Sequence, residues 1–202
     1  HTLSVALDSV HVGVSTPGGD LSPDMSSVNG KGFDMTLSVL GKEGNLSGAE
    51  AIEYNLGGGG TKNVAATFQA LFPDLAGKPL KIGDTWATQD TISERGSNGA
   101  TVLIFEGTNT LAGYETVNGH ECAKITEVST GSLTGQGNES GMALTYEGKI
   151  SGTSTWYFAY KEGFLVSVTG SGSVDATIKG SGPQEITIPM TRDYVVATTL
   201  VE

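Results

Sequence analysis

The sequence predicts a mainly β domain, built as a large curved antiparallel sheet (a half-barrel or open barrel) wrapped around one α-helix. Two observations predict the sheet: short stretches in which apolar and polar residues alternate, and 30 glycines that separate these stretches together with many Ser and Thr residues. One stretch with apolar residues at helical spacing predicts the helix. No charge-rich or Pro-rich linker divides the chain, so a single β-rich domain is expected over residues 1–202.

The clearest strand signal begins at Phe33. Apolar residues follow at Met35, Leu37 and Val39 with polar residues between them, and Lys42-Glu43-Gly44 is expected to turn the chain. A second strand is expected through Ala51, Ile52 and Tyr54. This part of the chain therefore predicts an antiparallel hairpin.

The same pattern of alternating apolar residues followed by a Lys-Glu-Gly turn occurs later in the chain. There Trp156, Phe158 and Tyr160 alternate with other residues before the turn Lys161-Glu162-Gly163. Asn118-Gly119 strongly favours a type I′ hairpin. Further strands are expected near Val102 to Phe105, Leu111 to Val117, His120 to Val128, Met142 to Tyr146, Val174 to Ile178, Ile186 to Met190 and Tyr194 to Leu200. Sheets of about ten strands tend to curl or split, which predicts the curvature.

One segment after the glycine run at 57–60 breaks the β pattern, because its large apolar residues recur at helical spacing. These residues are Val64, Phe68, Leu71 and Phe72. Pro73 is expected to end the helix, which places it at about residues 62–73, between two strand-rich parts. A lone helix of about three turns is marginal in water, so the concave face of the sheet is its predicted partner. The glycine run is interpreted as a flexible joint rather than a phosphate loop.

The charge balance excludes several classes of function. Lys and Arg number 11 against 22 Asp and Glu, which gives a net charge of -11. Such a field repels nucleic acid and disfavours an anionic membrane surface. No run of about 18 apolar residues occurs, so no transmembrane segment is expected. Cys122 is the only cysteine, which rules out a disulfide within the chain.

No motif predicts catalysis, a metal or a cofactor. The three histidines, His1, His11 and His120, lack the close spacing typical of a zinc site. His120 and Cys122 share a strand face, but side chains at i and i+2 lie about 7 Å apart, too far for an activating hydrogen bond. A G-x-S-x-G elbow is absent, and the acids are scattered. The most prominent of them are Asp84, Glu106, Glu115, Glu121 and Glu147.

Several short stretches, taken in order, resemble a family. They are Phe33-Asp34-Met35-Thr36-Leu37-Ser38, Leu71-Phe72-Pro73, Pro79-Leu80-Lys81-Ile82-Gly83-Asp84-Thr85-Trp86, Gly113-Tyr114-Glu115 and Gly119-His120-Glu121-Cys122-Ala123-Lys124-Ile125. From about Phe33 onward the chain resembles uncharacterised exported bacterial proteins, often lipoproteins, and is similar in outline to the half-barrel carriers of the LolA and LolB type. These motifs are structural, and the acylated Cys near the start of such lipoproteins has no counterpart here. The resemblance implies an extracytoplasmic location, in the periplasm or at the cell surface.

The resemblance also implies an apolar cavity between the concave sheet face and the helix, where carriers of that type bind acyl chains. We predict that its lining includes Val64, Phe68, Leu71, Phe72, Trp86 and Trp156. Core packing is the alternative role for Trp156. The predicted function is a non-enzymatic exported protein that binds a lipid or other apolar small molecule. The alternatives are a structural or protein-interaction module of the bacterial cell envelope and, with least support, a hydrolase.

Overall fold

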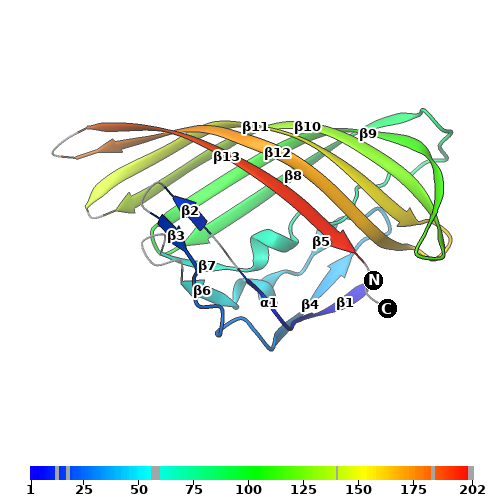
Figure 1. Ribbon diagram of the computed structural model, residues 1–202, viewed down its shortest axis with the longest axis horizontal. Coiled ribbons are helices and arrows are strands. Elements are labelled where there is room, and N and C mark those ends of the chain that lie inside the picture. Colours follow the sequence, from blue (N-terminus) through cyan, green and yellow to red (C-terminus); the bar gives the residue numbers. More distant parts are fainter. Residues whose placement is uncertain (12–13, 17–18, 56–59, 140, 183–184, 200–202) are drawn as a thin grey trace.

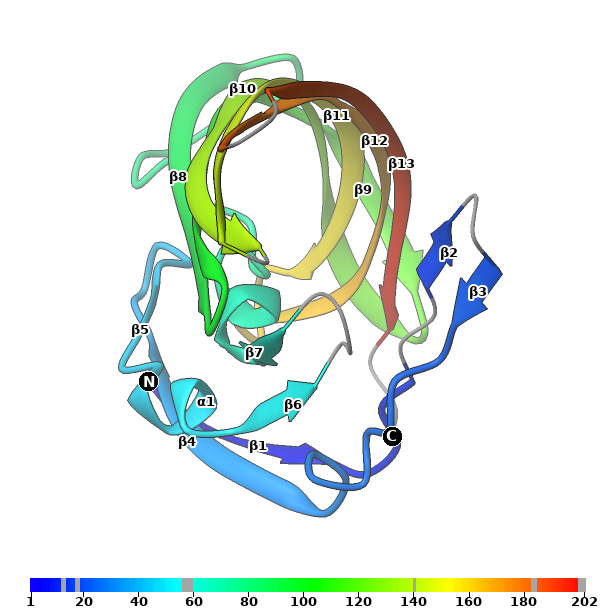
Figure 2. The ribbon, with the colours of Figure 1, turned by 90° about the vertical axis from the view of Figure 1, so that its left-hand side faces the viewer.

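One large sheet arches over a smaller N-terminal layer in the computed structural model (Figure 1). Seen from the end, the sheet curls into an incomplete ring, and the N-terminal layer lies across its open side (Figure 2). The predicted fold class is therefore confirmed: the chain is mainly β, and its large curved antiparallel sheet does not close. The structure describes residues 1–11, 14–16, 19–55, 60–139, 141–182 and 185–199.

The large sheet is a meander of six antiparallel strands in the order β13-β12-β11-β10-β9-β8. The Asn118-Gly119 turn has φ angles of 50° and 81°, as the predicted type I′ hairpin requires, and Gly163 closes another hairpin at φ 85°. The strands are β8 (Thr85–Gly96), β9 (Gly99–Val117), β10 (His120–Glu139), β11 (Met142–Ala159), β12 (Phe164–Ser181) and β13 (Ile186–Thr199).

These strands are longer and fewer than the sequence predicts. The segments Val102 to Phe105 and Leu111 to Val117, expected as separate strands, both belong to β9, which has 19 residues. The residues between them include Gly107 and Asn109, which read as a break in the sequence. Both are buried and lie within the ladder opposite β10. A polar or glycine residue interrupts the hydrophobic pattern without interrupting the backbone hydrogen bonds.

Glycines on the concave face permit the sharp curl of the sheet. A Cβ at Gly131 would lie 2.0 Å from the carbonyl oxygen of Ile104 on the neighbouring strand, and one at Gly172 would lie 2.4 Å from that of Ser151. No side chain larger than hydrogen fits at those distances. The curvature that makes the sheet a half-barrel therefore depends on glycine at defined positions.

The N-terminal layer, formed by the described residues up to Phe68, has a core of its own. The predicted stripe is confirmed at Phe33 and Met35, which are buried on the inner face of β4. Val39 lies beyond the strand and is exposed, because the chain turns at Gly41 (φ 94°) and not at Gly44. The elements are β1 (Thr2–Leu7), β2 (Val14–Thr16), β3 (Gly19–Leu21), β4 (Lys31–Leu37), β5 (Glu43–Gly44), α1 (Ser47–Glu50), β6 (Glu53–Asn55), β7 (Thr61–Asn63) and the 3₁₀ helix η2 (Ala65–Phe68).

The predicted helix at residues 62–73 is wrong in its length. Residues 61–63 form β7, which pairs with β6, and only η2 is helical. Gln69 is extended and Ala70 has a φ of 61°, so the chain leaves helical geometry there. A short isolated helix is marginal, and hydrogen bonds to two other parts of the molecule hold the chain from residue 69 onward in a non-helical path. The predicted joint at 57–60 lies outside the described residues except for Gly60.

The stretch at residues 69–75, called here the crossing segment, is neither helix nor strand and passes between the large sheet and the N-terminal layer (Figure 2). The large sheet curves around the crossing segment, and η2 packs beside it.

In the part of the chain that the structure describes, none of the helices is long and apolar enough to span a membrane.

Candidate functional site

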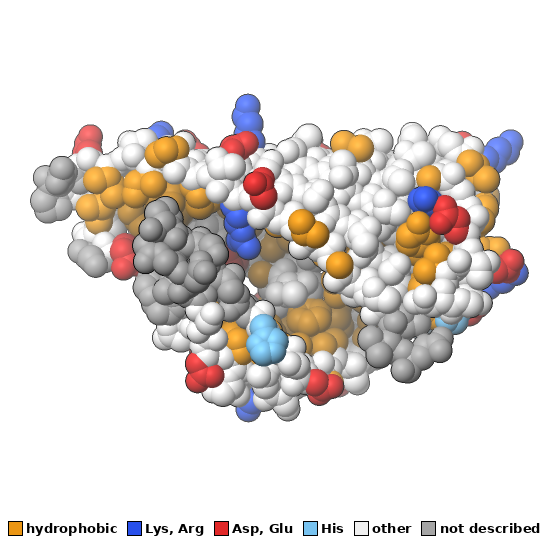
Figure 3. All heavy atoms as spheres, viewed as in Figure 1, with side chains coloured by type: hydrophobic (Ala, Val, Ile, Leu, Met, Phe, Trp, Pro, Cys, Tyr) orange, Lys and Arg blue, Asp and Glu red, His pale blue; other side chains and the backbone are white. Residues whose placement is uncertain are grey.

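A cavity of about 200 Å³ lies between the concave face of the large sheet and the crossing segment. The space-filling view shows the molecule hollowed between the edge strand β13 and the N-terminal layer, with hydrophobic atoms in its depth (Figure 3). Tyr194 and Val196 line the cavity from β13, and Phe72 and Asp74 line it from the crossing segment. The lining thus combines all six strands of the large sheet with a segment that crosses in front of them.

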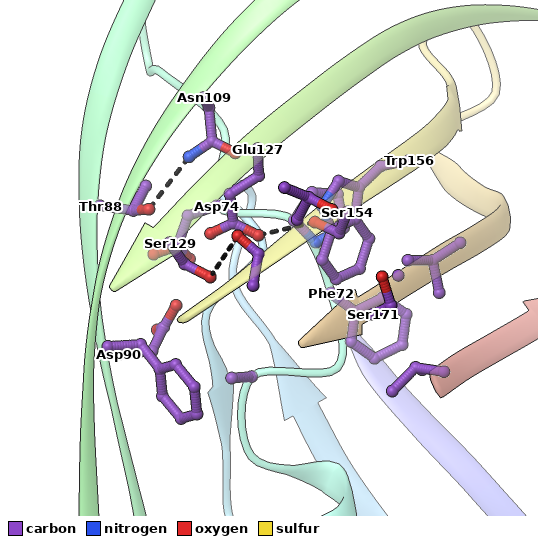
Figure 4. Close-up of a pocket in the computed structure, with 18 of the residues that line it drawn as sticks. Phe72, Asp74, Thr88, Asp90, Asn109, Glu127, Ser129, Ser154, Trp156 and Ser171 are labelled. Atoms are coloured by element: carbon purple, nitrogen blue, oxygen red, sulfur yellow. Dashed lines mark hydrogen bonds between the residues drawn. The ribbon is translucent and has the colours of Figure 1, made fainter. Parts of the chain in front are cut away.

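The concave face carries a polar row across its middle. Asn109 stands opposite Glu127 in the strand register, and Glu127 stands opposite Ser154, so their side chains share one face. The neighbouring row is apolar and runs through Ile125, Trp156 and Val168. Figure 4 shows the polar row beside Trp156, with Phe72 and Asp74 facing it. The site is therefore amphipathic, with one polar side and aromatic walls.

Strand β10 shows how the sequence builds this face. Ala123, Ile125, Glu127 and Ser129 follow one another at intervals of two, so all four face the same side of the sheet. Ala123 and Ile125 are buried in an apolar cluster, whereas Glu127 brings a carboxylate onto the same stripe. A charged residue in phase with a buried stripe is the signal that could have pointed to this site from the sequence alone.

Hydrogen bonds hold the polar row in place. The hydroxyl of Ser154 donates to Glu127 Oε2 at 2.7 Å, and Asn109 Nδ2 donates to Thr88 Oγ1 at 3.0 Å. Asn109 is only 3% exposed, and buried polar groups need partners of this kind. Within the described part of the chain, Glu127 makes no ion pair. Its charge therefore faces the cavity without a counter-ion.

The crossing segment is held at both of its ends and in its middle. The Gln69 side chain donates a hydrogen bond to the backbone carbonyl of Ser93 and accepts one from its backbone amide. These two bonds satisfy part of the open edge of β8. The amide of Phe72 donates to Glu43 Oε1 at 2.8 Å. The indole N–H of Trp86 donates to the carbonyl of Asp74 at 2.7 Å. These bonds explain why residues 69–75 are not helical and why they stay against the sheet.

Lys42 bridges two carboxylates at the rim of the cavity. Its Nζ contacts Asp74 and lies 2.5 Å from Asp90 Oδ1. Burial raises the pKa of Asp74, although the hydrogen bond from Lys42 opposes that shift. Burial alone would lower the pKa of Lys42, but its hydrogen bonds to Asp74 and Asp90 raise it overall. The ammonium of Lys42 thus joins β8 to the crossing segment.

Burial also raises the pKa of Glu43 above its ordinary value of 4.5, against the lowering effect of the Phe72 amide. Between pH 4.5 and the raised pKa, the folded chain holds a proton that the unfolded chain releases, so stability falls as pH rises through that window. We expect Glu43→Gln, which keeps the acceptor for Phe72, to weaken this dependence. Thermal unfolding between pH 4.5 and 7.5 measures it, with Glu106→Gln on the exposed convex face as the control. If the stability of Glu43→Gln changed with pH as much as that of the unmodified protein, the raised pKa of Glu43 would not be its cause.

The six residues predicted to line a cavity fall into three places. Phe72 and Trp156 line the cavity described here. Val64 and Phe68 belong to the core of the N-terminal layer, where Phe68 packs edge-on against Phe33 at 4.9 Å. Trp86 is buried in the apolar cluster beside that cavity and lines a separate pocket, whereas Leu71 is half-buried outside both linings. The prediction placed all of them on one helix-and-sheet surface, and the short η2 separates them.

The other candidates from the sequence are placed away from the cavity. Cys122 is buried, burial raises the pKa of its thiol, and the thiol faces the backbone carbonyl of His120 rather than the imidazole. Among the residues with described positions, no group of three or more metal-ligating side chains comes together. The carboxylates of the cavity are Asp74, Asp90 and Glu127, which the sequence did not single out. Three of the acids that it did, Glu115, Glu121 and Glu147, form exposed ion pairs with lysines.

Comparison of the chain with protein-family models, with curated proteins and with solved structures finds no match. The resemblance to half-barrel lipoprotein carriers therefore stays a prediction.

Proposed function

We propose that this protein is a non-enzymatic binding protein for a small ligand that has an apolar body and one polar group. The observation that supports the proposal is the amphipathic cavity under the crossing segment. Binding pockets commonly combine mostly apolar walls with a few placed polar groups. Here Phe72 and Trp156 stand beside the row of Asn109, Glu127 and Ser154 (Figure 4), and Phe105 also lines the cavity.

The volume limits the size of the ligand. An apolar cavity of about 150 Å³ accepts benzene, and drug-sized ligands occupy about 300–1,000 Å³. At about 200 Å³, the cavity suits one ring or a short chain. A whole lipid would need the crossing segment to move, so we narrow the proposal from lipids to small molecules. The proposed location remains the periplasm or cell surface of a bacterium, as the resemblance implies.

The polar groups of the cavity are placed rigidly, which suits recognition of a ligand. All of the polar row is carried by neighbouring strands of one sheet, where the backbone ladder fixes each side chain. A glycoside hydrolase would need two positioned carboxyls with separate roles. Asp74 and Asp90 are both engaged by Lys42, which leaves Glu127 as the carboxylate free of an ion pair among the described lining residues.

Filling the cavity is the test. Ser129 lines it with a small side chain, so we expect Ser129→Leu to weaken binding of a neutral ring-sized probe, benzyl alcohol, by at least about tenfold. Thr130→Leu is the matched control, because it adds the same side chain to the next residue on the exposed convex face. Saturation-transfer NMR measures binding, and thermal unfolding checks that both variants fold. Native mass spectrometry of the purified protein looks for a retained ligand.

Two results would count against the proposal. One is that neither benzyl alcohol nor a retained ligand is detected on the unmodified protein. The other is that Ser129→Leu binds the probe as well as Thr130→Leu does, which would place the site elsewhere.

A protein-interaction module is the second candidate, and the edge strand β13 favours it. β13 ends the sheet and has no further strand beside it among the described residues, while Val195 on it is 82% exposed. Unpaired edges can receive a strand from another chain. In that case, co-purification from a bacterial envelope fraction would depend on β13 and would survive Ser129→Leu.

A further inference from the structure

The charges around the cavity do not balance. Its lining includes three carboxylates, Asp74, Asp90 and Glu127, and no Lys, Arg or His residue. Lys42 reaches Asp74 and Asp90 from the rim, and one ammonium group cannot neutralise two carboxylates and also serve a third. The cavity as described thus carries net negative charge, which attracts cations and repels anions.

Glu127 is the carboxylate of the cavity that Lys42 does not contact. Its Oε1 stands over Gly107, where a Cβ would lie only 2.4 Å away, so glycine leaves the room that the carboxylate occupies. A carboxylate offers about four acceptor positions, and Ser154 uses one of them. A half-buried anion with vacant acceptor positions is stabilised by a donor that carries positive charge.

Tyr194 reaches from the edge strand β13 into the same cavity, where a Cβ at Gly152 would lie 2.9 Å from its hydroxyl oxygen. Burial raises the pKa of the Tyr194 hydroxyl, and the negative charge of Glu127 raises it further.

The walls suit a cation as well. Four aromatic side chains surround the space, namely Phe72, Phe105, Trp156 and Tyr194. Aromatic faces attract ammonium groups, and tryptophan does so most strongly. Aromatic walls around a carboxylate are therefore a setting in which an organic cation is bound by both its charge and its carbon atoms.

Trp156 provides an independent observation. This residue is 8% exposed and lines the cavity, yet its indole N–H has no hydrogen-bond partner in the described structure. Buried donors without partners are rare and costly, so a bound molecule with an acceptor atom would satisfy this one. A hydroxyl or carbonyl oxygen on the ligand would accept this hydrogen bond after a small adjustment of the indole.

We propose that the ligand is a small organic cation whose ammonium group pairs with Glu127 while its apolar body packs against Trp156 and the other aromatic walls. This inference rests on the binding function proposed above, and it adds the charge of the ligand. A bare metal ion is a poorer occupant, because no group of three ligating side chains comes together among the described residues.

Three probes of one shape test the sign of the charge: benzylamine, which is a cation at pH 7, benzyl alcohol, which is neutral, and benzoate, which is an anion. We expect the Kd of benzylamine to be about tenfold lower than that of benzyl alcohol at low salt, which corresponds to 1.4 kcal/mol. Benzoate is expected to bind weakest. Titration followed by calorimetry or by ligand-observed NMR gives the three constants.

Two variants assign the preference to Glu127. Glu127→Gln keeps the size and the acceptor for Ser154 but removes the charge, so benzylamine and benzyl alcohol are expected to bind alike. Glu106→Gln changes the net charge of the chain by the same amount on the exposed convex face, and is expected to keep the tenfold preference.

The outcomes separate this inference from the function on which it rests. Benzyl alcohol or benzoate binding as tightly as benzylamine would overturn the cation and leave the cavity as a binding site. A preference that persists in Glu127→Gln would overturn the pairing with Glu127. Failure of all three probes to bind the folded protein, with no retained ligand detected by native mass spectrometry, would overturn the binding function itself.

Discussion

Replacing Gly131 by alanine is expected to lower the free energy of unfolding by about 3 kcal/mol. The added Cβ would lie 2.0 Å from the carbonyl oxygen of Ile104 and 3.1 Å from Cα of Phe105, both backbone atoms of the paired strand β9. Neither can move aside unless the sheet flattens, and flattening would open the cavity. Urea unfolding followed by circular dichroism measures the change.

The control is Gly113→Ala in the same strand pair. Gly113 lies at the bulge between β9 and β10, and a Cβ there would meet nothing within 4 Å. That change is expected to stay within about 0.5 kcal/mol of the unmodified protein. Equal losses for the two variants would show that glycine is not what sets the curvature at Gly131.

Replacing Lys42 by methionine is expected to cost about 2 kcal/mol of unfolding free energy. Removing one partner of a buried ion pair leaves its counter-charge unpaired, at about 3–5 kcal/mol, and the half-exposed Lys42 reduces that figure. Asp74 is the most affected carboxylate, since its side chain is 11% exposed. The two anions would also push the crossing segment away from β8, so binding in the cavity should weaken together with stability.

The pH dependence of Lys42→Met distinguishes lost charge pairing from lost packing. Burial already raises the pKa of Asp74, and Lys42 is the group that opposes this rise. Without Lys42, Asp74 gains a proton more readily, so the variant should recover stability as pH falls below neutrality towards 4.5 and lose it as pH rises. Thermal unfolding at several pH values tests this expectation.

Lys179→Met is the matched control for that prediction. Lys179 pairs with Glu147 on the exposed convex face, where both side chains are more than half exposed. Surface pairs contribute about 0–1 kcal/mol, so little change is expected. If Lys179→Met lowers the free energy of unfolding as much as Lys42→Met does, the prediction that Lys42 stabilises the rim of the cavity is wrong.

The strands of the large sheet could be predicted in kind but not in length. Alternation at Trp156 and Phe158 and the turn at Asn118-Gly119 identified hairpins correctly, because both signals are local. Residues such as Gly107 and Asn109 read as interruptions, since nothing in the sequence shows that they face a cavity rather than a loop. The number of strands in the large sheet was therefore overestimated, and their length was underestimated.

The helix shows how a tertiary contact can override a local pattern. Val64, Phe68, Leu71 and Phe72 have helical spacing, yet only η2 forms. Gln69 pairs with the edge of β8, and Glu43 accepts from the amide of Phe72. Glu43 and Ser93 lie about 25 residues or more from the segment that they hold, so neither partner is visible in the local sequence.

The candidate site was predicted only in part. Phe72 and Trp156 were named, whereas Glu127, Asp74 and Lys42 were not. A carboxylate in phase with a buried stripe marks Glu127 in retrospect, but the crossing segment that faces it in the cavity (Figure 4) lies about 50 residues earlier in the chain. No local pattern joins two such positions.

By itself, the sequence determined that this protein is an acidic antiparallel β chain with turns at defined places, because alternation, turn residues and net charge act over a few residues or over the whole chain at once. The tertiary structure alone decided that the sheet curls around a non-helical segment, that the curl leaves a small cavity, and that Glu127 lies beside aromatic walls with no ion-pair partner among the described residues. The physical reason is that curvature and cavity arise from contacts between strands and segments far apart in the chain, where a glycine or a carboxylate takes its meaning from what lies opposite it.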